Sequence, residues 1–304
     1  PTETVYGLGA NALDDEAVKK IFAAKNRPSY DPLIVHLADP TKIATYADLT
    51  NPSIHHNFLA LQKFWPGPLS IIFPLKGEIA PSVTAGLNSV AFRIPHHPIA
   101  LTLLKEVDLP IAAPSANQFS YVSPTTASHV QDSLGEKVEI ILDGGKASLG
   151  IESTVISLVE ATPTILRPGF ITKKMIEEVI GPVNIVQRKQ SSDMTSSLPS
   201  PGMLDKHYSP LTKLKFLNEV EIEKLPSKVG LILFRSTSPI NDSRIVTIKT
   251  LSANENLEEI ASSLYDAIRE LDNNQLDLIL IDSCPIDDLG LAIMDRIIRA
   301  THKA

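Results

Sequence analysis

Short runs of β-branched and aromatic residues alternate with helical patterns along the first 186 residues, and this alternation defines the fold class. Apolar runs of about four to eight residues between turn signals are typical of strands. We expect such strands at 33–37, 69–73, 89–94, 138–142, 154–158 and 164–167. The intervening patterns predict helices at 14–25, 97–106 and 124–134, with Ser123 as the N-cap of the last. The sequence thus predicts an α/β domain built on a twisted mixed sheet.

A segment rich in Ser and Pro follows this domain and divides the chain. Residues 187–210 have no hydrophobic period that would bury one face, so we interpret them as a linker. After the linker, helical patterns at 255–271 and 287–302 alternate with runs typical of strands at 213–217, 229–234, 244–248 and 276–282. This pattern predicts a smaller Rossmann-like α/β domain over 211–304, after a first domain over 1–186.

Composition excludes several classes of protein. No apolar run reaches the roughly 20 residues that a membrane-spanning helix needs, so we expect no membrane insertion. The single cysteine, Cys284, excludes a disulfide framework and a multi-cysteine zinc site, and it is typical of a protein in the reducing cytoplasm. A net charge of -7 argues against a broadly cationic nucleic-acid binder. Because the chain starts at Pro1 instead of Met, we expect that some N-terminal sequence is missing.

Two motifs near the start of the chain carry groups suited to a polar or phosphorylated ligand. PTETVYGLGA combines hydroxyl groups, including that of Thr4, with Gly7 and Gly9, where the backbone can approach a ligand closely. KNR places Lys25 and Arg27 together, and a lysine point charge beside an arginine fork suits phosphate oxygens. Both motifs also have a structural interpretation, as a turn with surface threonines and as cations that complement a helix dipole.

Two later motifs add polar side chains near expected strand ends. APSANQFSYVSPT contains Ser115, Asn117 and Ser123 in a loop that suits a phosphate or ribose, although turn chemistry also explains these residues. GIESTV and LRPG contribute Glu152, Ser153, Thr154 and Arg167 near strand ends, where α/β proteins commonly bind ligands. The chain lacks the P-loop, GxGxxG, GxSxG and HExxH patterns, which argues against a P-loop, a dinucleotide site, a serine hydrolase and a zinc enzyme.

The order and spacing of these motifs resemble the YrdC-type threonylcarbamoyl-adenylate synthases. The similarity covers essentially all of residues 1–170, through PTETVYGLGA, KNRPxxxPLIVH, WPGPLS, VAFRIPHHP, PIAAPSAN, SPT, DGG, ESTV and LRPG. The linker PGMLDKHYSP and the tail GLAIMDRIIRAT resemble the long form of the family, which adds a C-terminal Rossmann-like domain. The resemblance therefore spans nearly the whole chain and implies a YrdC-like catalytic domain followed by that smaller domain.

The resemblance implies a nucleotidyltransferase that uses L-threonine, bicarbonate and ATP to make threonylcarbamoyl-adenylate and pyrophosphate. A separate tRNA-modifying threonylcarbamoyl transferase complex would consume the product, while direct tRNA binding by this chain is left open. We expect Mg²⁺ to arrive with ATP, because no cluster of carboxylates in the sequence announces a dedicated metal site. The reaction needs positioning and charge neutralisation, with no covalent protein intermediate.

By motif matching, the resemblance also implies roles for individual residues. The threonine pocket would be lined by Thr4, His36, Arg93, Ala113 and Ser153, with the arginine as a fork for the carboxylate. The nucleotide would contact Arg27, Asp31, Ser89, Ser115, Ser123, Arg167, His207 and Tyr208. The catalytic group would comprise Lys25, Arg27, Ser115 and Asn117. No residue is expected to bind a metal ion directly. From its position alone, His36 is equally well explained as a core histidine.

Three departures from the family pattern limit this transfer of roles. Gln118, Phe119 and Tyr121 stand where the family often has a small, basic stretch, which affects the expected loop shape. Asp205 occupies a position that is usually aromatic, and Asp295 replaces a common Asn. The contacts expected from the end of the linker are therefore limited to those of the HYSP segment.

Two other functional classes stay open at this point. A carbamoyltransferase of the hydrogenase-maturation type shares the YrdC fold, but such proteins carry cysteine-rich zinc modules, which a chain with one cysteine lacks. A non-catalytic RNA-binding module would use the KxR cleft, with steep salt dependence and no ATP turnover.

We further expect the linker to act as a lid. A polar connection of this length between compact domains is uncommon unless it is functional or disordered. Its HYSP end places an imidazole and a phenol where neither is needed for packing. The segment PGMLDKHY, residues 201–208, would then fold over the nucleotide and exclude water from the adenylate. A solvated tether is the alternative.

Overall fold

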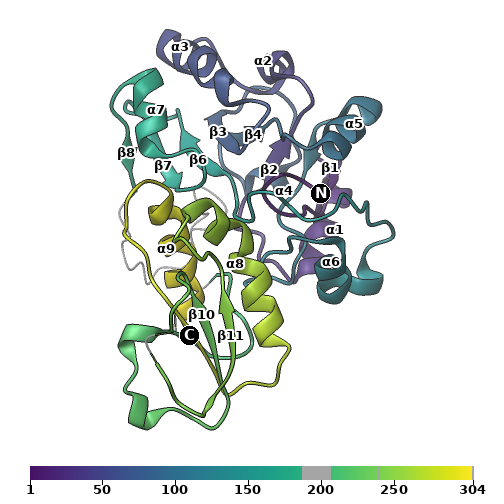
Figure 1. Ribbon diagram of the computed structural model, residues 1–304. Helices are drawn as coiled ribbons and strands as arrows, with labels where there is room; N and C mark the ends of the chain where they lie inside the picture. The colour runs from purple at the N-terminus through teal and green to yellow at the C-terminus, as the bar shows by residue number, and fades with distance from the viewer. Residues whose placement is uncertain (187–206, 239, 303–304) are drawn as a thin grey trace.

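The described residues form two sheets, and the larger one has eight strands in a mixed arrangement. The computed structural model describes residues 1–186, 207–238 and 240–302 (Figure 1). The larger sheet has the order β1-β5-β2-β4-β3-β6-β7-β8. Its strands are β1 (Ala10–Asn11), β2 (Ile34–His36), β3 (Leu69–Pro74), β4 (Ser89–Arg93), β5 (Ile111–Ala112), β6 (Thr154–Ser157), β7 (Thr164–Arg167) and β8 (Asn184–Ile185). The predicted mixed-sheet α/β class is confirmed.

Helices form in this domain where capping residues and apolar patterns coincide. The carboxylate of Asp14 accepts hydrogen bonds from the backbone N–H groups of Glu16 and Ala17, which caps the first helix. That helix ends at Asn26, which adopts the left-handed conformation. The helices are α1 (Asp15–Lys25), α2 (Ile43–Tyr46), α3 (Pro52–Leu61), α4 (Pro81–Thr84), α5 (Pro98–Val107), α6 (Ala127–Leu134) and α7 (Lys173–Ile180).

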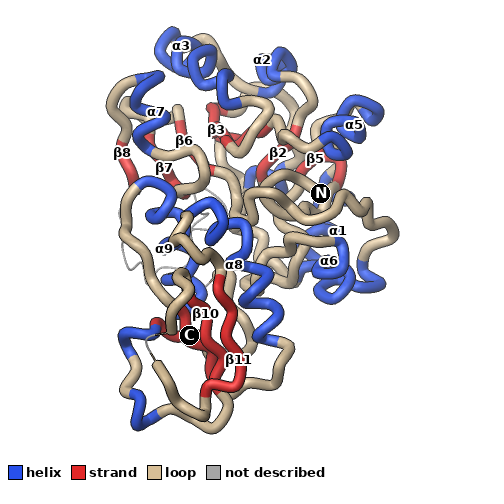
Figure 2. The backbone as a smooth tube through the Cα atoms, in the orientation of Figure 1, coloured by secondary structure: helices blue, strands red, loops and turns tan. Residues whose placement is uncertain are grey.

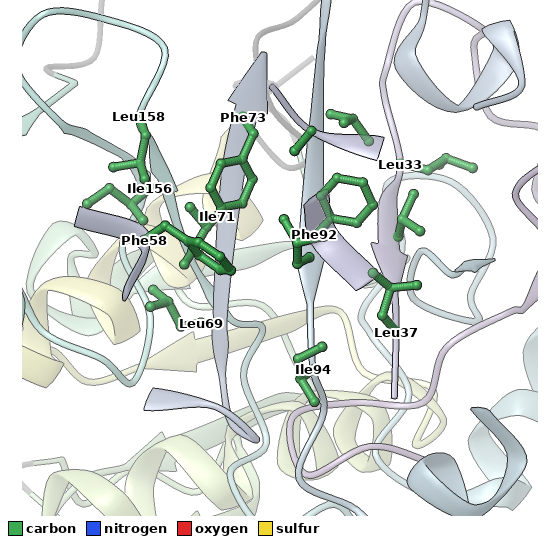
Figure 3. Close-up of a cluster of buried hydrophobic side chains, with 14 of the residues drawn as sticks. Leu33, Leu37, Phe58, Leu69, Ile71, Phe73, Phe92, Ile94, Ile156 and Leu158 are labelled. Carbon is green, nitrogen blue, oxygen red and sulfur yellow. The ribbon is translucent and has the colours of Figure 1, made fainter. Parts of the chain in front are cut away.

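The main core covers one face of the larger sheet. Successive side chains of a strand point to opposite faces, so Leu69, Ile71 and Phe73 of β3 share a face with Phe92 of β4 (Figure 3). Phe58 of α3 packs edge-on against Phe73, with ring centroids 5.3 Å apart. His36 and Arg93 follow core residues of β2 and β4 and therefore point to the other face.

A register shift between β6 and β7 directs one more arginine to that other face. Val155 pairs with Arg167 and Ile156 pairs with Ile165, so Leu166 is an extra residue in β7. Such a bulge re-aims the side chains that follow it. Arg167 is thereby placed opposite Val155, on the face where His36 and Arg93 lie.

The smaller sheet is parallel throughout and has the order β11-β10-β12-β9. Its strands are β9 (Leu214–Phe216), β10 (Val229–Leu233), β11 (Ile245–Thr250) and β12 (Leu278–Ile281). The helices α8 (Leu257–Asp272) and α9 (Asp288–Thr301) lie between this sheet and the larger domain (Figures 1 and 2). Val5, Val122 and Ile151 of the larger domain share a buried cluster with these helices. The larger domain and the helices of the smaller domain therefore share one apolar interface.

Two local predictions for the larger domain are wrong. Residues 138–142 form no strand, because Val138 and Ile141 pack at the edge of a small cluster while Ile140 is 78% exposed. Ser123 does not cap α6, whose N-cap is Thr126. The Ser123 hydroxyl instead donates a hydrogen bond to a buried carboxylate.

The other expected strands and helices form in the predicted order along the chain. β8 pairs with β7, so the larger sheet extends to Ile185. Residues 187–206 lie outside the described residues, and with them lie Asp205 and most of the segment expected to form a lid. Among the described residues, no helix is long and apolar enough to cross a membrane.

Candidate active site

Strand ends from four parts of the chain meet at one edge of the larger sheet. β2 and β4 run in parallel and end at His36 and Arg93. β6 is parallel to β3, which is antiparallel to β4, so its start, directly after Ser153, lies at the same edge. β7 is antiparallel to β6 and ends there at Arg167. The topology thus brings together residues that are more than a hundred positions apart in the sequence.

A cavity at this edge gathers most of the predicted site residues. Of those residues, it is lined by Thr4, Arg27, His36, Arg93, Ala113, Ser115, Ser153, Arg167, His207 and Tyr208. Val5, Ile34, Pro114 and Glu152 complete the lining. Four further predicted residues, Lys25, Asp31, Asn117 and Ser123, hold the lining from behind. Ser89 is not brought to the cavity, because it stands at the opposite end of β4, so its expected nucleotide contact stays a prediction.

Arg93 is tied to the first motif of the chain. Its Nη2 donates to Glu3 Oε1 at 2.6 Å, its Nη1 to Thr4 Oγ1 at 2.9 Å and its Nε to the Gly67 carbonyl at 3.2 Å. Glu3 also accepts a hydrogen bond from the backbone of His96. A guanidinium has five N–H groups, so two remain for a ligand. The predicted fork is therefore oriented by a buried ion pair that the motif analysis missed.

Arg27 forms the second buried ion pair of the site. Its Nη2 lies 2.9 Å from Asp31 Oδ1 and also donates to the Pro32 carbonyl at 2.9 Å. Neither carboxylate oxygen of Asp31 has a well-aligned hydrogen-bond donor. Burial raises the pKa of Asp31, and the charges of Arg27, Lys25 and Arg167 oppose this rise. The pair is held together by charge and leaves acceptor positions open.

Lys25 holds the serine-rich loop from behind the cavity. Its Nζ donates to the carbonyls of Ser115 and Asn117, each at 2.5 Å. The Asn117 amide in turn donates to the carbonyls of Gln118 and Tyr121. Burial, and then the charge of Arg27, lowers the pKa of Lys25 well below its usual value, while the charge of Asp31 opposes this change. Nearby negative charge from a ligand would stabilise this buried cation.

The residues that depart from the family pattern shape the same loop. The Gln118 side chain donates to the Ser133 carbonyl, and the Tyr121 hydroxyl donates to Asp272 at 2.8 Å. The Phe119 ring packs edge-on against His207. These side chains therefore link the loop to α6, to α8 and to the end of the linker.

Arg167 and Ser153 form a third linked group. The Arg167 Nη2 donates to Ser153 Oγ at 3.1 Å, and its Nε donates to the Ser153 carbonyl at 3.1 Å. Ser153 Oγ also lies 2.8 Å from Ser70 Oγ. Next to them, Glu152 accepts hydrogen bonds from Ser123 at 2.6 Å and from Arg296 Nε at 2.8 Å. Glu152 of the ESTV motif thus lines the cavity, as its position near an expected strand end predicts, although the resemblance gave it no role.

The end of the linker closes one side of the cavity. His207 and Tyr208 are buried, and the Tyr208 ring stacks on Tyr265 of α8 with centroids 5.7 Å apart. This packing contradicts the expectation that neither ring is needed for packing. Burial, together with the nearby Arg27 and Lys25, lowers the pKa of His207 well below its usual value. The imidazole is therefore neutral at physiological pH.

Unpaired buried polar atoms point to a ligand at this place. Within the described ranges, the buried side-chain atoms without a hydrogen-bond partner are both Asp31 carboxylate oxygens, His36 Nδ1, Asn117 Oδ1, His207 Nδ1, Tyr208 Oη and Arg296 Nη2, together with His97 Nδ1. Burying such atoms is costly unless they find partners. The cavity thus offers cations, acceptors and a phenol to a polar, anionic molecule. In the described part of the chain, no group of three or more His, Cys, Asp or Glu side chains is arranged to hold a metal ion.

The buried His36 makes stability depend on pH in one direction. Burial, and then the charge of Arg93, lowers its pKa from 6.5 to about 3. Below pH 6.5 the unfolded chain takes up a proton that the folded chain does not, so the free energy of unfolding falls as pH decreases towards 3. The loss should reach about 2 kcal/mol by pH 5.

This dependence is measured by urea denaturation at pH 7 and pH 5. We expect His36→Asn to lose less stability than wild type between the two pH values, since its side chain cannot take up a proton. The exposed His56→Asn is the control and should lose as much as wild type. Equal losses in all three proteins would contradict the assignment to His36.

Comparisons with known proteins agree with this geometry along the whole chain. A family model for Sua5, YciO and YrdC described as "Telomere recombination" matches residues 1–169. A second model, "Threonylcarbamoyl-AMP synthase, C-terminal domain", matches residues 171–301. The threonylcarbamoyl-AMP synthase of Bacillus subtilis is 44% identical, covering 99% of this chain and 88% of the relative. The enzyme of the same name from Pyrococcus abyssi is 39% identical, with 99% and 89% covered.

A solved structure is similar over the same length. The crystal structure of P. abyssi Sua5 complexed with L-threonine has a TM-score of 0.88 and 37% sequence identity, covering 99% of this chain and 89% of that chain. These matches favour neither the hydrogenase-maturation transferase nor the non-catalytic RNA-binding module. Because the family models and the full-length relatives agree, the chain belongs to the threonylcarbamoyl-AMP synthase family.

Proposed function

We propose that this chain converts L-threonine, bicarbonate and ATP into L-threonylcarbamoyl-AMP and pyrophosphate. The observation that carries the proposal is the cavity at the strand ends, where Arg27, Arg93 and Arg167 gather beside buried polar atoms that lack protein partners. Three guanidinium groups suit a ligand set that contains one carboxylate and several phosphates. The threonine complex of P. abyssi Sua5 supports the threonine half of the assignment.

The reaction is balanced in two steps. The threonine amine attacks bicarbonate, a C–N bond forms, and water leaves with the amine proton, which gives a carbamate. A carbamate oxygen then attacks the α-phosphorus of ATP, the bond from that phosphorus to the bridging oxygen breaks, and pyrophosphate leaves with the electron pair. Neither step needs a covalent intermediate on the protein, and positioning and charge neutralisation supply the catalysis.

Each group at the cavity has a place in this scheme. Arg93 binds the threonine carboxylate, while Arg27 and Arg167 neutralise phosphate charge. Lys25 and Asn117 act by shaping the loop that carries Ser115. Mg²⁺ enters with ATP as part of the substrate. We place the reaction in the cytoplasm, where a separate tRNA-modifying transferase complex would consume the labile adenylate.

The expected result is strict dependence of pyrophosphate release on both small substrates. With the purified chain and Mg·ATP, pyrophosphate should form only when L-threonine and bicarbonate are present together, because the nucleophile is the carbamate that they make. The measurement is coupled detection of pyrophosphate, with each substrate omitted in turn from buffers purged of carbon dioxide. Release of inorganic phosphate, or pyrophosphate release without threonine, would sink the proposal.

A further inference from the structure

A buried arginine of the smaller domain reaches the wall of the cavity. Arg296 lies on α9, has no exposed surface, and donates from Nε to Glu152 Oε2 at 2.8 Å. Its Nη1 donates to the neighbouring Asp295 at 2.8 Å, and its Nη2 has no partner. A buried carboxylate is stable in ionised form only when it is paired and hydrogen-bonded. The smaller domain therefore supplies the cation that Glu152 needs.

Glu152 is also held by a second helix of the smaller domain. The Tyr265 hydroxyl of α8 donates to its two oxygens at 3.0 and 3.3 Å. The next residue in the chain is Ser153, to which Arg167 is hydrogen-bonded twice. Glu152, Ser153 and Arg167 all line the same cavity. A shift of Glu152 would therefore move both the serine and the arginine of the site.

The same arginine supports the end of the linker. The Arg296 guanidinium lies over the Tyr208 ring, 5.4 Å from its centroid, and the same ring stacks on Tyr265. Tyr208 lines the cavity next to His207. Arg296 thus contacts both Glu152 in the cavity wall and Tyr208 at the end of the linker.

We propose that Arg296 is a positioning residue for the synthase site, which it fixes through Glu152. This inference rests on the proposed function, because it names the part of the chain that holds its substrate cavity in shape. It gives the smaller domain a definite task in the reaction: α8 and α9 complete the inner wall of the cavity. Asp295, the departure from the family pattern, belongs to the same group, since it accepts from Arg296 and from Arg299.

The test compares two buried arginines of the smaller domain. Arg296→Met should lower kcat/KM for pyrophosphate release roughly tenfold or more, a loss typical of residues that orient site groups from behind. Arg269→Met is the matched control, because Arg269 also crosses to the larger domain but bonds to the carbonyls of Val122 and Ser123 and not to Glu152. The control should lower the melting temperature and leave KM for threonine and ATP unchanged.

A double-mutant cycle shows whether Arg296 acts through Glu152. In a Glu152→Gln background the carboxylate is gone, so adding Arg296→Met should change kcat/KM by less than about threefold. If Arg296→Met only loosened the packing between the domains, kcat/KM would instead fall by a similar factor in both backgrounds. An equal loss in both backgrounds would overturn the proposal, and so would a loss in Arg269→Met as large as in Arg296→Met.

A pH profile gives a second, independent readout. Burial opposes ionisation of Glu152, but the charges of Arg296 and Arg167 and the Ser123 hydrogen bond hold its pKa below the usual range. Removing Arg296 should raise this pKa and move the acid limb of kcat/KM to higher pH. The groups that face the carboxylate are Ser123, Arg167 of β7, Tyr208, Tyr265 of α8 and Arg296 of α9.

Folding and function are kept apart in the same experiment. If Arg296→Met does not fold, Arg296→Lys keeps the charge but loses the planar fork that reaches Glu152 and Asp295 together, and it should fold with an intermediate kcat/KM and the wild-type acid limb. An unaltered kcat/KM in the folded variants would overturn the inference alone. Absence of threonine-dependent pyrophosphate release from the wild-type chain would instead contradict the proposed function.

Discussion

Replacing Arg93 by Met should weaken threonine binding by at least about 100-fold, while ATP binding changes by less than about threefold. The variant removes the fork expected to hold the threonine carboxylate, and it leaves Glu3 as an uncompensated anion beside the same pocket. Both effects oppose a carboxylate ligand. Isothermal titration calorimetry with threonine, and separately with ATP, measures the two affinities on one protein sample.

Stability must be separated from recognition in this experiment. Breaking the buried Arg93–Glu3 pair should itself cost on the order of 3–5 kcal/mol, because one charge stays buried without its partner. The double variant Arg93→Met/Glu3→Gln removes both charges and should recover most of the lost stability without recovering threonine affinity. Equal losses of threonine and ATP affinity in the double variant would show that Arg93 has a structural role only.

Much of the fold is predictable because short apolar runs between turn signals are typical of strands. The strands around Val35, Ile71 and Phe92 were predicted within one or two residues for this reason. The two-residue strands β1, β5 and β8 are too short to carry any such pattern. Residues 138–142 are an apolar run that forms no strand, since Val138 and Ile141 pack against a small cluster and Ile140 is exposed.

The candidate site is likewise only partly predictable from the sequence. The motifs predict which cations and hydroxyl groups belong to the site, because these residue types suit phosphate and carboxylate ligands. Which carboxylate accompanies which arginine depends on contacts between segments that are distant in sequence. Glu3 and Glu152 stand inside quoted motifs, yet only the folded chain pairs them with Arg93 and Arg296. A charge count along the sequence contains no information about such pairing.

The opposite substrate dependence is expected from Arg27, which lines the same cavity but is paired with Asp31 instead of Glu3. Arg27→Met should lower kcat/KM for ATP by about 100- to 1,000-fold, the range for losing one preorganised group that stabilises developing charge. The threonine affinity should stay within about threefold of wild type, since the threonine fork and its Glu3 partner are untouched.

Arg27→Met also leaves a buried partner without its counter-charge, because Asp31 has no exposed surface and is paired with Arg27. In the single variant burial would raise the Asp31 pKa further and destabilise the fold at neutral pH. Arg27→Met/Asp31→Asn removes this cost and keeps the expected ATP defect. Steady-state pyrophosphate assays on this variant and on Arg93→Met/Glu3→Gln should give crossed results, one protein impaired for ATP and the other for threonine. If both variants lost the same substrate, the assignment of Arg93 to the threonine carboxylate and of Arg27 to the phosphates would be wrong.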